Sequence, residues 1–273
     1  PITGASSTNT ITFRGAGDSS QTIIEHDGSA RYATITLAGA DYIRFEDLTI
    51  ETTASTDGWG IHFTSGADSN IVSNCYIKTS TTATLDVIGI VFSGSPTSEI
   101  TTGQNGNGNT IQYCFIEGGE RNIHAEGDIT TPNTGNRFLY NVMRSADDYC
   151  IYTDDQSNMD IIGNDMILNR STLGDALYLL TPEDFRVEQN YIESPDWTVY
   201  ILDGNLNGSG RSTFINNIVY SSTDYAVYMN EIDNTDIYNN TILGEPAVYM
   251  LSHSGIDMRN NMLLSTGDFA FEN

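Results

Sequence analysis

Phe214-Ile-Asn-Asn-Ile-Val219 and Ile237-Tyr-Asn-Asn-Thr-Ile242 follow one pattern, and this pattern decides the fold. An apolar residue is followed by two variable positions and then by a position that is usually Asn. One further position and a second apolar residue complete the pattern. The pattern occurs nine times at intervals of 21 to 39 residues, and the other occurrences begin at Phe45, Val72, Ile111, Phe138, Ile162, Val187 and Met258. Self-similarity with a period of a few tens of residues is typical of solenoid proteins.

A second short element precedes each of these stretches. It consists of a small residue, an apolar residue, any residue and another apolar residue, as in Ala176-Leu-Tyr-Leu179 and Ala226-Val-Tyr-Met229. Alternation of apolar and other side chains at a period of two indicates β-strands. The sequence therefore predicts an all-β fold, a right-handed parallel β-helix of about ten coils, formed as a single domain by residues 1–273.

Stacked coils place equivalent residues above one another at the ~4.8 Å spacing of neighbouring strands. We expect one column of amides that hydrogen bond from coil to coil. Its predicted members are Asn141, Asn190, Asn217, Asn240 and Asn261, with Asp165 as an interruption and Leu48, Cys75 and Cys114 at its early end. Cys75 and Cys114 either form a disulfide or pack as two free thiols, and Cys150 is expected to pack in the core.

The charge of the chain excludes some partners. The sequence contains 36 acidic and 11 basic residues, which gives a formal net charge of −25. A nucleic-acid partner is not expected, because binding to phosphates requires a basic surface. Membrane insertion is not expected either, because the sequence has no apolar run of about 18 residues.

The repeated strands resemble the parallel β-helix repeat superfamily, the pectin-lyase-like proteins, over essentially the whole chain. Residues 9–14 and 40–50 are most similar to the β-helix region of large secreted bacterial surface proteins. The resemblance implies an extracellular or bacterial cell-surface protein whose partner is a polysaccharide or a cell-surface glycan. Because Phe269-Ala-Phe-Glu-Asn273 starts another strand, we expect a fragment of a longer protein, monomeric as a fragment.

One outward row of the second element is aromatic in five successive coils. Its members are Tyr152, Tyr178, Tyr200, Tyr228 and Tyr249. These rings either stabilise neighbouring strands by stacking or form a strip that binds neutral glycans through ring faces and hydroxyls. The neighbouring row is small, as at Gly60, Ala176 and Ala226, and we expect it to face outward and leave the rings accessible.

A further outward row brings carboxyl groups together in two consecutive coils. Glu126 and Asp154 occupy equivalent positions, and Asp155 follows directly. Carboxyl groups about 5 Å apart match the pair of a retaining glycosidase, which supplies an acid, a base or a nucleophile. His124, two residues before Glu126, could assist. A chain with 36 acidic residues also brings such groups together by chance.

The residues argue against two activities of the superfamily. Asp147-Asp148-Tyr149-Cys150 is similar to the Asp-Asp-Cys motif of pectin-hydrolysing members, but their Gly-His-Gly element is absent from the next coil. Lyases of this fold typically use Lys or Arg against a uronate, and Lys78 is the only lysine in the sequence.

Asp203-Gly-Asn205-Leu-Asn207-Gly208 is similar to the first half of a calcium loop, with oxygen ligands at alternate positions before a glycine. Phe214 stands where such a loop needs its bidentate Glu. Asp203, Asn205 and Asn207 therefore form either a Ca²⁺ site or an ordinary turn between strands.

Two segments between strands, residues 94–109 and residues 126–136, are longer than a corner requires. We expect them to form the walls of a groove.

Two functions are compatible with these observations. The favoured one is a non-catalytic extracellular β-helix module of a large secreted or cell-surface protein, which acts as an adhesive or a spacer and binds neutral glycans along the tyrosine strip. The alternative is a polysaccharide-active enzyme, a glycoside hydrolase or a lyase, that uses the acidic site on the face of the β-helix.

Overall fold

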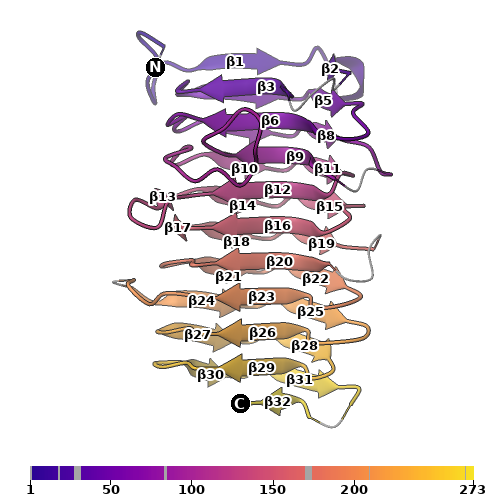
Figure 1. Ribbon diagram of the computed structural model, residues 1–273, viewed down its shortest axis with the longest axis vertical. Coiled ribbons are helices and arrows are strands. Elements are labelled where there is room, and N and C mark those ends of the chain that lie inside the picture. Colours follow the sequence, from indigo (N-terminus) through magenta and orange to yellow (C-terminus); the bar gives the residue numbers. More distant parts are fainter. Residues whose placement is uncertain are drawn as a thin grey trace.

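The computed structural model describes residues 2–17, 19–27, 32–82, 85–169, 174–208, 210–267 and 269–273. These residues form a parallel β-solenoid of about nine turns, with the coils stacked along one axis (Figure 1). The chain therefore has the all-β parallel β-helix fold that its repeats predict. The described residues include one 3₁₀ turn, η1 (Ser19–Gln21), and none of their helices has the length and apolar character needed to cross a membrane.

Three parallel sheets of ten strands each run along the solenoid. The first sheet contains β1 (Ile11–Arg14), β4 (Ile43–Glu46), β7 (Ile71–Ser73), β10 (Thr110–Gln112), β14 (Arg137–Leu139), β18 (Asp160–Ile162), β21 (Arg186–Glu188), β24 (Ser212–Ile215), β27 (Thr235–Tyr238) and β30 (Asp257–Arg259). The second sheet contains β2 (Ile23–His26), β5 (Thr49–Thr52), β8 (Tyr76–Lys78), β11 (Phe115–Glu117), β15 (Val142–Arg144), β19 (Asp165–Ile167), β22 (Tyr191–Ser194), β25 (Ile218–Ser221), β28 (Thr241–Gly244) and β31 (Met262–Ser265).

The third sheet carries the candidate site. Its strands are β3 (Tyr32–Ala38), β6 (Gly58–Thr64), β9 (Val87–Phe92), β12 (Arg121–Glu126), β16 (Tyr149–Asp154), β20 (Asp175–Leu180), β23 (Val199–Leu202), β26 (Val227–Asn230), β29 (Val248–Leu251) and β32 (Phe271–Glu272). A small two-stranded sheet of β13 (Asn133–Thr134) and β17 (Gln156–Ser157) lies beyond the ends of β12 and β16.

Apolar side chains in equal register fill the interior. In the first sheet, Ile111 pairs with Val72 and with Phe138, and all three are fully buried. The residues on either side of Ile111 in its strand point away from the core. Each buried aliphatic side chain stabilises the fold by roughly 1.5–3 kcal/mol. The register is therefore fixed, because a shift by one residue would exchange the buried and the outward side chains.

A left-handed residue followed by asparagine makes the corner between the first and second sheets. Gln189 has a φ of 59° and precedes Asn190. Asn190 donates from its amide to the side-chain oxygen of Asn217 at 3.0 Å and to the carbonyl oxygen of Ile161 at 2.9 Å. The same kind of amide-to-amide bond links the column Asn141, Asn164, Asn190, Asn217, Asn240 and Asn261.

Asn164, and not the predicted Asp165, occupies this column. The sequence pattern was counted from Ile162, whereas Ile161 is the residue that pairs with the buried core positions of the neighbouring coils. Both isoleucines are followed by an apolar residue at the required distance, but only the count from Ile161 places an asparagine, Asn164, at the position that is usually Asn. The count from Ile162 therefore shifted the predicted register by one residue.

The three cysteines, Cys75, Cys114 and Cys150, are buried free thiols. Cys114 lies directly before the asparagine column, because its backbone N–H donates to the side-chain oxygen of Asn141 at 2.9 Å. Its thiol donates to the carbonyl oxygen of Gln112 at 3.2 Å. Of the two alternatives for Cys75 and Cys114, the structure has the free thiols, and Cys150 lies in the core as expected.

A second column of amides, which the sequence pattern did not reveal, lies at the corner between the third and first sheets. Asn70 donates from its side chain to Asn109 at 3.0 Å, and the backbone N–H of Asn109 donates to Asn136 at 3.0 Å. Asn136 donates in turn to the side-chain oxygen of Gln156 at 3.1 Å. This buried column anchors the last residue of each of the two long segments, residues 94–109 and residues 126–136.

Candidate functional site

The outward face of the third sheet carries a stack of aromatic rings. Strand pairing places five tyrosines in equal register: Tyr152, Tyr178, Tyr200, Tyr228 and Tyr249. The ring centroids of successive tyrosines are 5.2, 4.9, 4.6 and 5.3 Å apart, and their planes are inclined by 15° to 30°. The rings therefore stack along the axis of the solenoid, one ring per coil.

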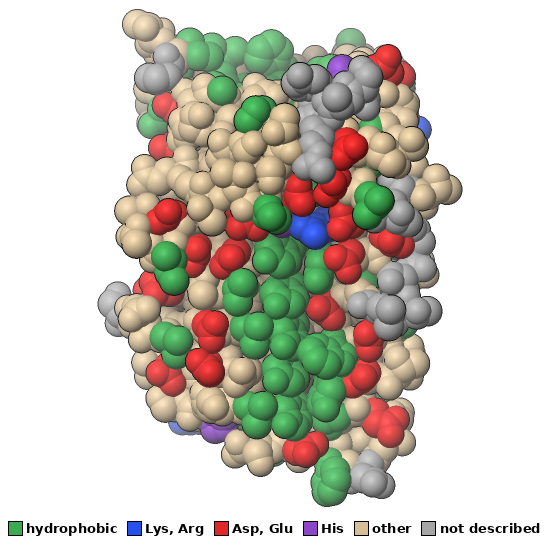
Figure 2. Space-filling model, in the orientation of Figure 1, with side chains coloured by type: hydrophobic (Ala, Val, Ile, Leu, Met, Phe, Trp, Pro, Cys, Tyr) green, Lys and Arg blue, Asp and Glu red, His purple; other side chains and the backbone are tan. Residues whose placement is uncertain are grey.

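A second row of aromatic side chains lies beside the tyrosines, and its members are Tyr149, Trp197 and Tyr225. Trp197 stacks on Tyr200 at 4.9 Å and on Tyr228 at 5.2 Å, and meets Tyr225 edge-on at 5.4 Å. We call these three residues and the five tyrosines the aromatic stripe. Figure 2 shows hydrophobic side chains gathered in a band over the third sheet, with Asp and Glu along both edges.

The row of small residues before the tyrosines, such as Ala176, faces the interior, so the prediction that it faces outward was wrong. Cys150 and Ile151 are consecutive and both fully buried. Alternation is interrupted there, and Tyr149 and Tyr152 on either side of them both face outward. The sheet therefore presents a second outward row next to the tyrosines, and that row contains large side chains.

Stacking determines which part of each ring a ligand can reach. The faces of Tyr178 and Tyr200 lie against rings of neighbouring coils, and both side chains are half-buried. The accessible surface therefore consists of ring edges, which are electropositive, and phenolic hydroxyls, which donate and accept hydrogen bonds. The ring faces, which the sequence pattern predicts as the contact surface for a glycan, are therefore covered by the stacking of the rings.

His124 continues the stack and leads into an acidic cluster. Its ring centroid lies 4.7 Å from that of Tyr152. Arg121 donates to His124 Nδ1 at 2.5 Å, and because a guanidinium only donates, the hydrogen of the imidazole is on Nε2. Nε2–H donates to Glu126 Oε1 at 2.8 Å. Burial, with the charge of Arg121, holds the pKa of His124 well below its ordinary value, so the imidazole is neutral.

Asp154 and Asp155 share one hydroxyl. Thr181 Oγ1 lies 2.8 Å from Asp154 Oδ1 and 2.6 Å from Asp155 Oδ1, and it also accepts the backbone N–H of Asp155 at 3.0 Å. A hydroxyl has one hydrogen, so the two carboxyl groups compete for it. Strand pairing places Glu126 beside Asp154. The structure thus brings together all of the predicted catalytic residues, and we call Glu126, Asp154 and Asp155 the acidic cluster.

Burial raises the pKa values of two of these carboxyl groups. The pKa of Glu126 rises to about 7 and that of Asp154 to about 6, because desolvation disfavours the charged form and the nearby Asp155 adds repulsion. Groups with such pKa values can both donate and accept protons near neutral pH. Since only 3% of Glu126 is exposed, Asp154 is the more accessible group.

A row of carboxylates borders the opposite edge of the aromatic stripe. Its members are Asp148, Asp196 and Asp224, each directly before an aromatic residue of the second row, and Asp175, which pairs in register with Tyr149 and so takes a place within that second row. Burial raises the pKa of Asp175 to about 8, and the charges of Asp196 and Asp148 add to the rise. Burial also raises the pKa of Asp148 to about 6. We call these four residues the carboxylate row.

The repeat pattern did not predict this row, although the sequence contains a signal for it. In three coils an aspartate directly precedes an outward aromatic residue: Asp148-Tyr149, Asp196-Trp197 and Asp224-Tyr225. The signal is hidden because the repeat was aligned on the tyrosine strand, and these pairs lie at or before the start of that strand.

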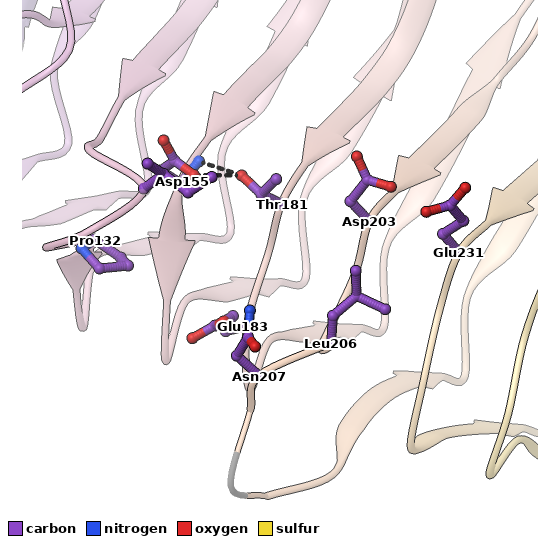
Figure 3. A pocket seen from close by; sticks show the side chains of 9 residues that line it. Pro132, Asp155, Thr181, Glu183, Asp203, Leu206, Asn207 and Glu231 are labelled. Carbon is purple, nitrogen blue, oxygen red and sulfur yellow. Dashed lines mark hydrogen bonds between the residues drawn. The ribbon is translucent and has the colours of Figure 1, made fainter.

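A pocket of about 250 Å³ lies at the ends of the strands of the third sheet, next to the acidic cluster (Figure 3). Its lining follows successive strands and includes Asp155, Thr181, Asp203 and Glu231, together with Glu183. Ile129 and Pro132 line it from residues 126–136, and Leu206 and Asn207 from the segment after β23. Of the two long segments, therefore, only residues 126–136 contribute to this pocket.

The structure separates the residues predicted to bind Ca²⁺. Asp203 and Asn207 line the pocket. Asn205 is fully buried, accepts the backbone N–H of Asp184 at 3.1 Å and donates to the carbonyl oxygen of Gly210 at 3.3 Å. Among the residues that the structure describes, no group of three or more His, Cys, Asp or Glu is placed to hold a metal ion. A calcium role for Asp203 and Asn207 stays a prediction.

Known structures share this architecture at low sequence identity. PfbA, a surface adhesin of Streptococcus pneumoniae, superposes with a TM-score of 0.62 and 11% identity over 87% of this chain and 63% of that protein. A second structure of the same adhesin gives a TM-score of 0.55 and 8% identity over 93% and 84% of the two chains. The A-module of the mannuronan C-5 epimerase AlgE6 of Azotobacter vinelandii gives 0.49 and 13% over 93% and 75%.

The two adhesin structures show a shared parallel β-helix fold. The chain spans 63% of the length of the first adhesin structure. No protein-family model and no curated protein sequence matches the chain. The function must therefore be argued from the site.

Proposed function

We propose that the chain is an extracellular β-helix module that binds a polysaccharide along the aromatic stripe. The observation that carries the proposal is the stripe itself, a continuous set of half-exposed aromatic side chains on one face. Such side chains combine apolar surface with hydroxyl and indole N–H groups, which suits sugars. The shared fold with a bacterial surface adhesin supports a location outside the cell and an adhesive role.

The stripe suits an extended polymer better than a single sugar. From Tyr152 to Tyr249 it spans four strand spacings, or roughly 20 Å. A polysaccharide that lies along the axis meets the same groups in each coil. Single edge contacts are weak, so we expect affinity to arise from several sugars bound at once.

Replacement of two central rings tests this proposal. We expect Trp197→Ala combined with Tyr200→Ala to lower the affinity for a bound polysaccharide at least about tenfold, measured by calorimetry. Tyr113→Ala is a matched control, because Tyr113 stacks on Tyr140 at 5.3 Å away from the third sheet. Melting curves establish that each variant is folded. Equal losses in the two variants, or the absence of any polysaccharide ligand, would refute the proposal.

One observation favours a second function, hydrolysis of the bound polysaccharide at the acidic cluster. Glu126 and Asp154 are neighbours with pKa values of about 7 and about 6, and His124 positions Glu126 by a hydrogen bond. Two such groups can supply the acid and its carboxylate partner.

Release of reducing ends tests the second function. We expect Asp154→Asn to abolish their release, whereas Glu193→Gln, on the second sheet, retains it. If no reducing ends appear from any polysaccharide that binds, the module is a binder without hydrolytic activity.

A further inference from the structure

Carboxylates border both edges of the aromatic stripe. The carboxylate row follows one edge over four coils, with Asp148, Asp175, Asp196 and Asp224. The other edge carries Asp154, Asp155, Asp203 and Glu231 at the ends of the strands. Figure 2 shows the same arrangement, with acidic side chains on both sides of the hydrophobic band. A polymer on the stripe therefore lies between two lines of carboxyl groups, of which Asp175, with its pKa raised to about 8, keeps its proton near neutral pH until a positive group approaches it.

Basic side chains neutralise little of this charge. Arg121 lies at one end of the stripe, with its guanidinium 4.0 Å from Asp148 and close to Glu120. From Tyr149 onward, the described strands of the third sheet and the described segments leading into them contain no Lys or Arg. The described arginines of these coils lie on or beside the other two sheets, each paired with a carboxylate there: Arg137, Arg144, Arg186, Arg211 and Arg259.

Such an arrangement is costly when no ligand is bound. Asp175 lies between Asp148 and Asp196, and burial together with these two charges raises its pKa to about 8. Positive groups placed along the edges lower the electrostatic energy of both carboxylate lines, whereas further negative groups raise it. The surface therefore discriminates between ligands by charge.

We infer that the polysaccharide recognised by the aromatic stripe is an amino-sugar polymer with free, protonated amines. This inference rests on the proposed function, since it names the chemistry of the ligand that the same stripe binds. Ring edges and hydroxyls contact the sugar rings, and the ammonium groups pair with the flanking carboxylates. A polyuronate is excluded by repulsion, and a neutral glycan binds without the electrostatic contribution.

Carboxylates on both edges fit such a polymer in a further respect. In a β-1,4-linked chain each sugar is turned over relative to the one before, so its amines point alternately to the two sides. One line of carboxylates could reach only alternate amines. Two lines reach all of them, and the spacing of one coil, ~4.8 Å, places a carboxylate near every sugar.

Matched oligosaccharides test the inference. Calorimetry compares the β-1,4-linked hexamer of glucosamine with the hexamer of N-acetylglucosamine, whose amines are acetylated and therefore uncharged. A galacturonate hexamer is the anionic probe, with and without Ca²⁺. At about pH 6 and low ionic strength we expect the glucosamine hexamer to bind at least about tenfold more tightly than its acetylated counterpart. About 0.5 M NaCl should remove most of this difference.

Variants of the carboxylate row locate the effect. We expect Asp196→Asn combined with Asp224→Asn to lower the affinity for the glucosamine hexamer about tenfold and to reduce the difference between the two hexamers. Glu193→Gln is the matched control, because it removes a carboxylate from the second sheet and should preserve the difference.

The outcomes separate the inference from the proposed function. Equal binding of the two hexamers, or tighter binding of the galacturonate hexamer, overturns the inference but leaves the aromatic stripe as a polysaccharide site. If no oligosaccharide or polysaccharide binds, both fail. If the charge preference survives in the Asp196 and Asp224 double variant, the amines are recognised elsewhere and the inference fails.

Discussion

A single asparagine amide connects three chain segments at the corner between the first and second sheets. Asn190 donates to Ile161 and Asn217 and accepts the backbone N–H of Asn164 at 2.8 Å. We expect Asn190→Ala to lower the free energy of unfolding by about 2–4 kcal/mol, because it leaves buried polar groups without partners. Urea denaturation followed by circular dichroism measures this loss.

Asn207→Ala is the control for this prediction. Asn207 is exposed. Its replacement should change the free energy of unfolding by no more than about 0.5 kcal/mol. Similar losses for Asn190 and Asn207 would mean that the buried amide contributes nothing beyond an ordinary surface residue.

The raised pKa of Glu126 makes the fold less stable as the pH rises. The folded pKa of about 7 exceeds the ordinary value of 4.5, so between these values the folded state retains a proton that the unfolded chain releases. This contribution is fully present below about pH 4.5 and is lost by about pH 7. We expect Glu126→Gln to gain up to about 3 kcal/mol in unfolding free energy relative to the wild type above pH 7.

Urea denaturation at about pH 4.5 and about pH 8 measures this difference, since the two values bracket the titration. The variant and the wild type should differ far more at the higher pH. A difference that is the same at both values would show that the carboxyl group of Glu126 titrates normally in the folded protein.

At the scale of single strands, a small residue occupies the inner corner before each tyrosine of the stripe. Gly89 is the equivalent residue before Val91. A Cβ at Gly89 would lie 2.6 Å from the carbonyl oxygen of Asn122 and 2.9 Å from a methyl group of Ile116. We expect Gly89→Ala to destabilise the protein by roughly 1–3 kcal/mol, because the close backbone cannot move away cheaply. Thermal unfolding measures the effect.

Gly204→Ala provides the comparison, since a Cβ at Gly204 meets its nearest neighbours at 3.5 Å, an ordinary contact distance. This variant should be nearly neutral. If both glycines tolerate alanine equally well, space at the inner corner is not the reason for the small residues there.

These corners also explain what the sequence could and could not predict. Alternation of apolar residues predicted the strands, because a buried interior imposes a period of two. At Cys150 and Ile151 the period is interrupted, and the tertiary corner, not the local pattern, turns two consecutive residues inward. The second row of the aromatic stripe was missed for this reason. Asp165 was misplaced because the pattern was taken to begin at Ile162, although the count from Ile161 places Asn164 at the asparagine position.

At the scale of the whole molecule, the repeats predicted the β-helix, but the site required the coils to be assembled. The predicted catalytic residues come together because β12 and β16 pair in register. Asn205 lies two residues from Asp203 in sequence, yet its side chain faces the interior, where it bonds Asp184 and Gly210. Spacing along the chain could not distinguish a ligand from a corner residue.

The net charge of −25 predicts that salt stabilises the fold. Repulsion among carboxylates weakens the compact state, and about 0.5 M NaCl screens it, so we expect the Tm to rise by a few degrees. Near pH 4, where many carboxyl groups are protonated, the same salt should have a smaller effect. A Tm that is independent of salt at neutral pH would show that the carboxylate lines do not repel appreciably.

The equal register of the tyrosines has one further consequence. A shift by one coil carries Tyr178 onto the place of Tyr200, and Tyr200 onto that of Tyr228. The stripe would therefore offer a long ligand of similar repeat a series of equivalent binding positions, with no preferred alignment along the axis. If the proposed polysaccharide binds there, we expect it to move along the axis by one coil at a time while its other sugars stay in contact with the surface. Dissociation of such a polymer from the stripe would be slow, because all of its contacts would have to break at once, whereas a force along the axis would make it slide.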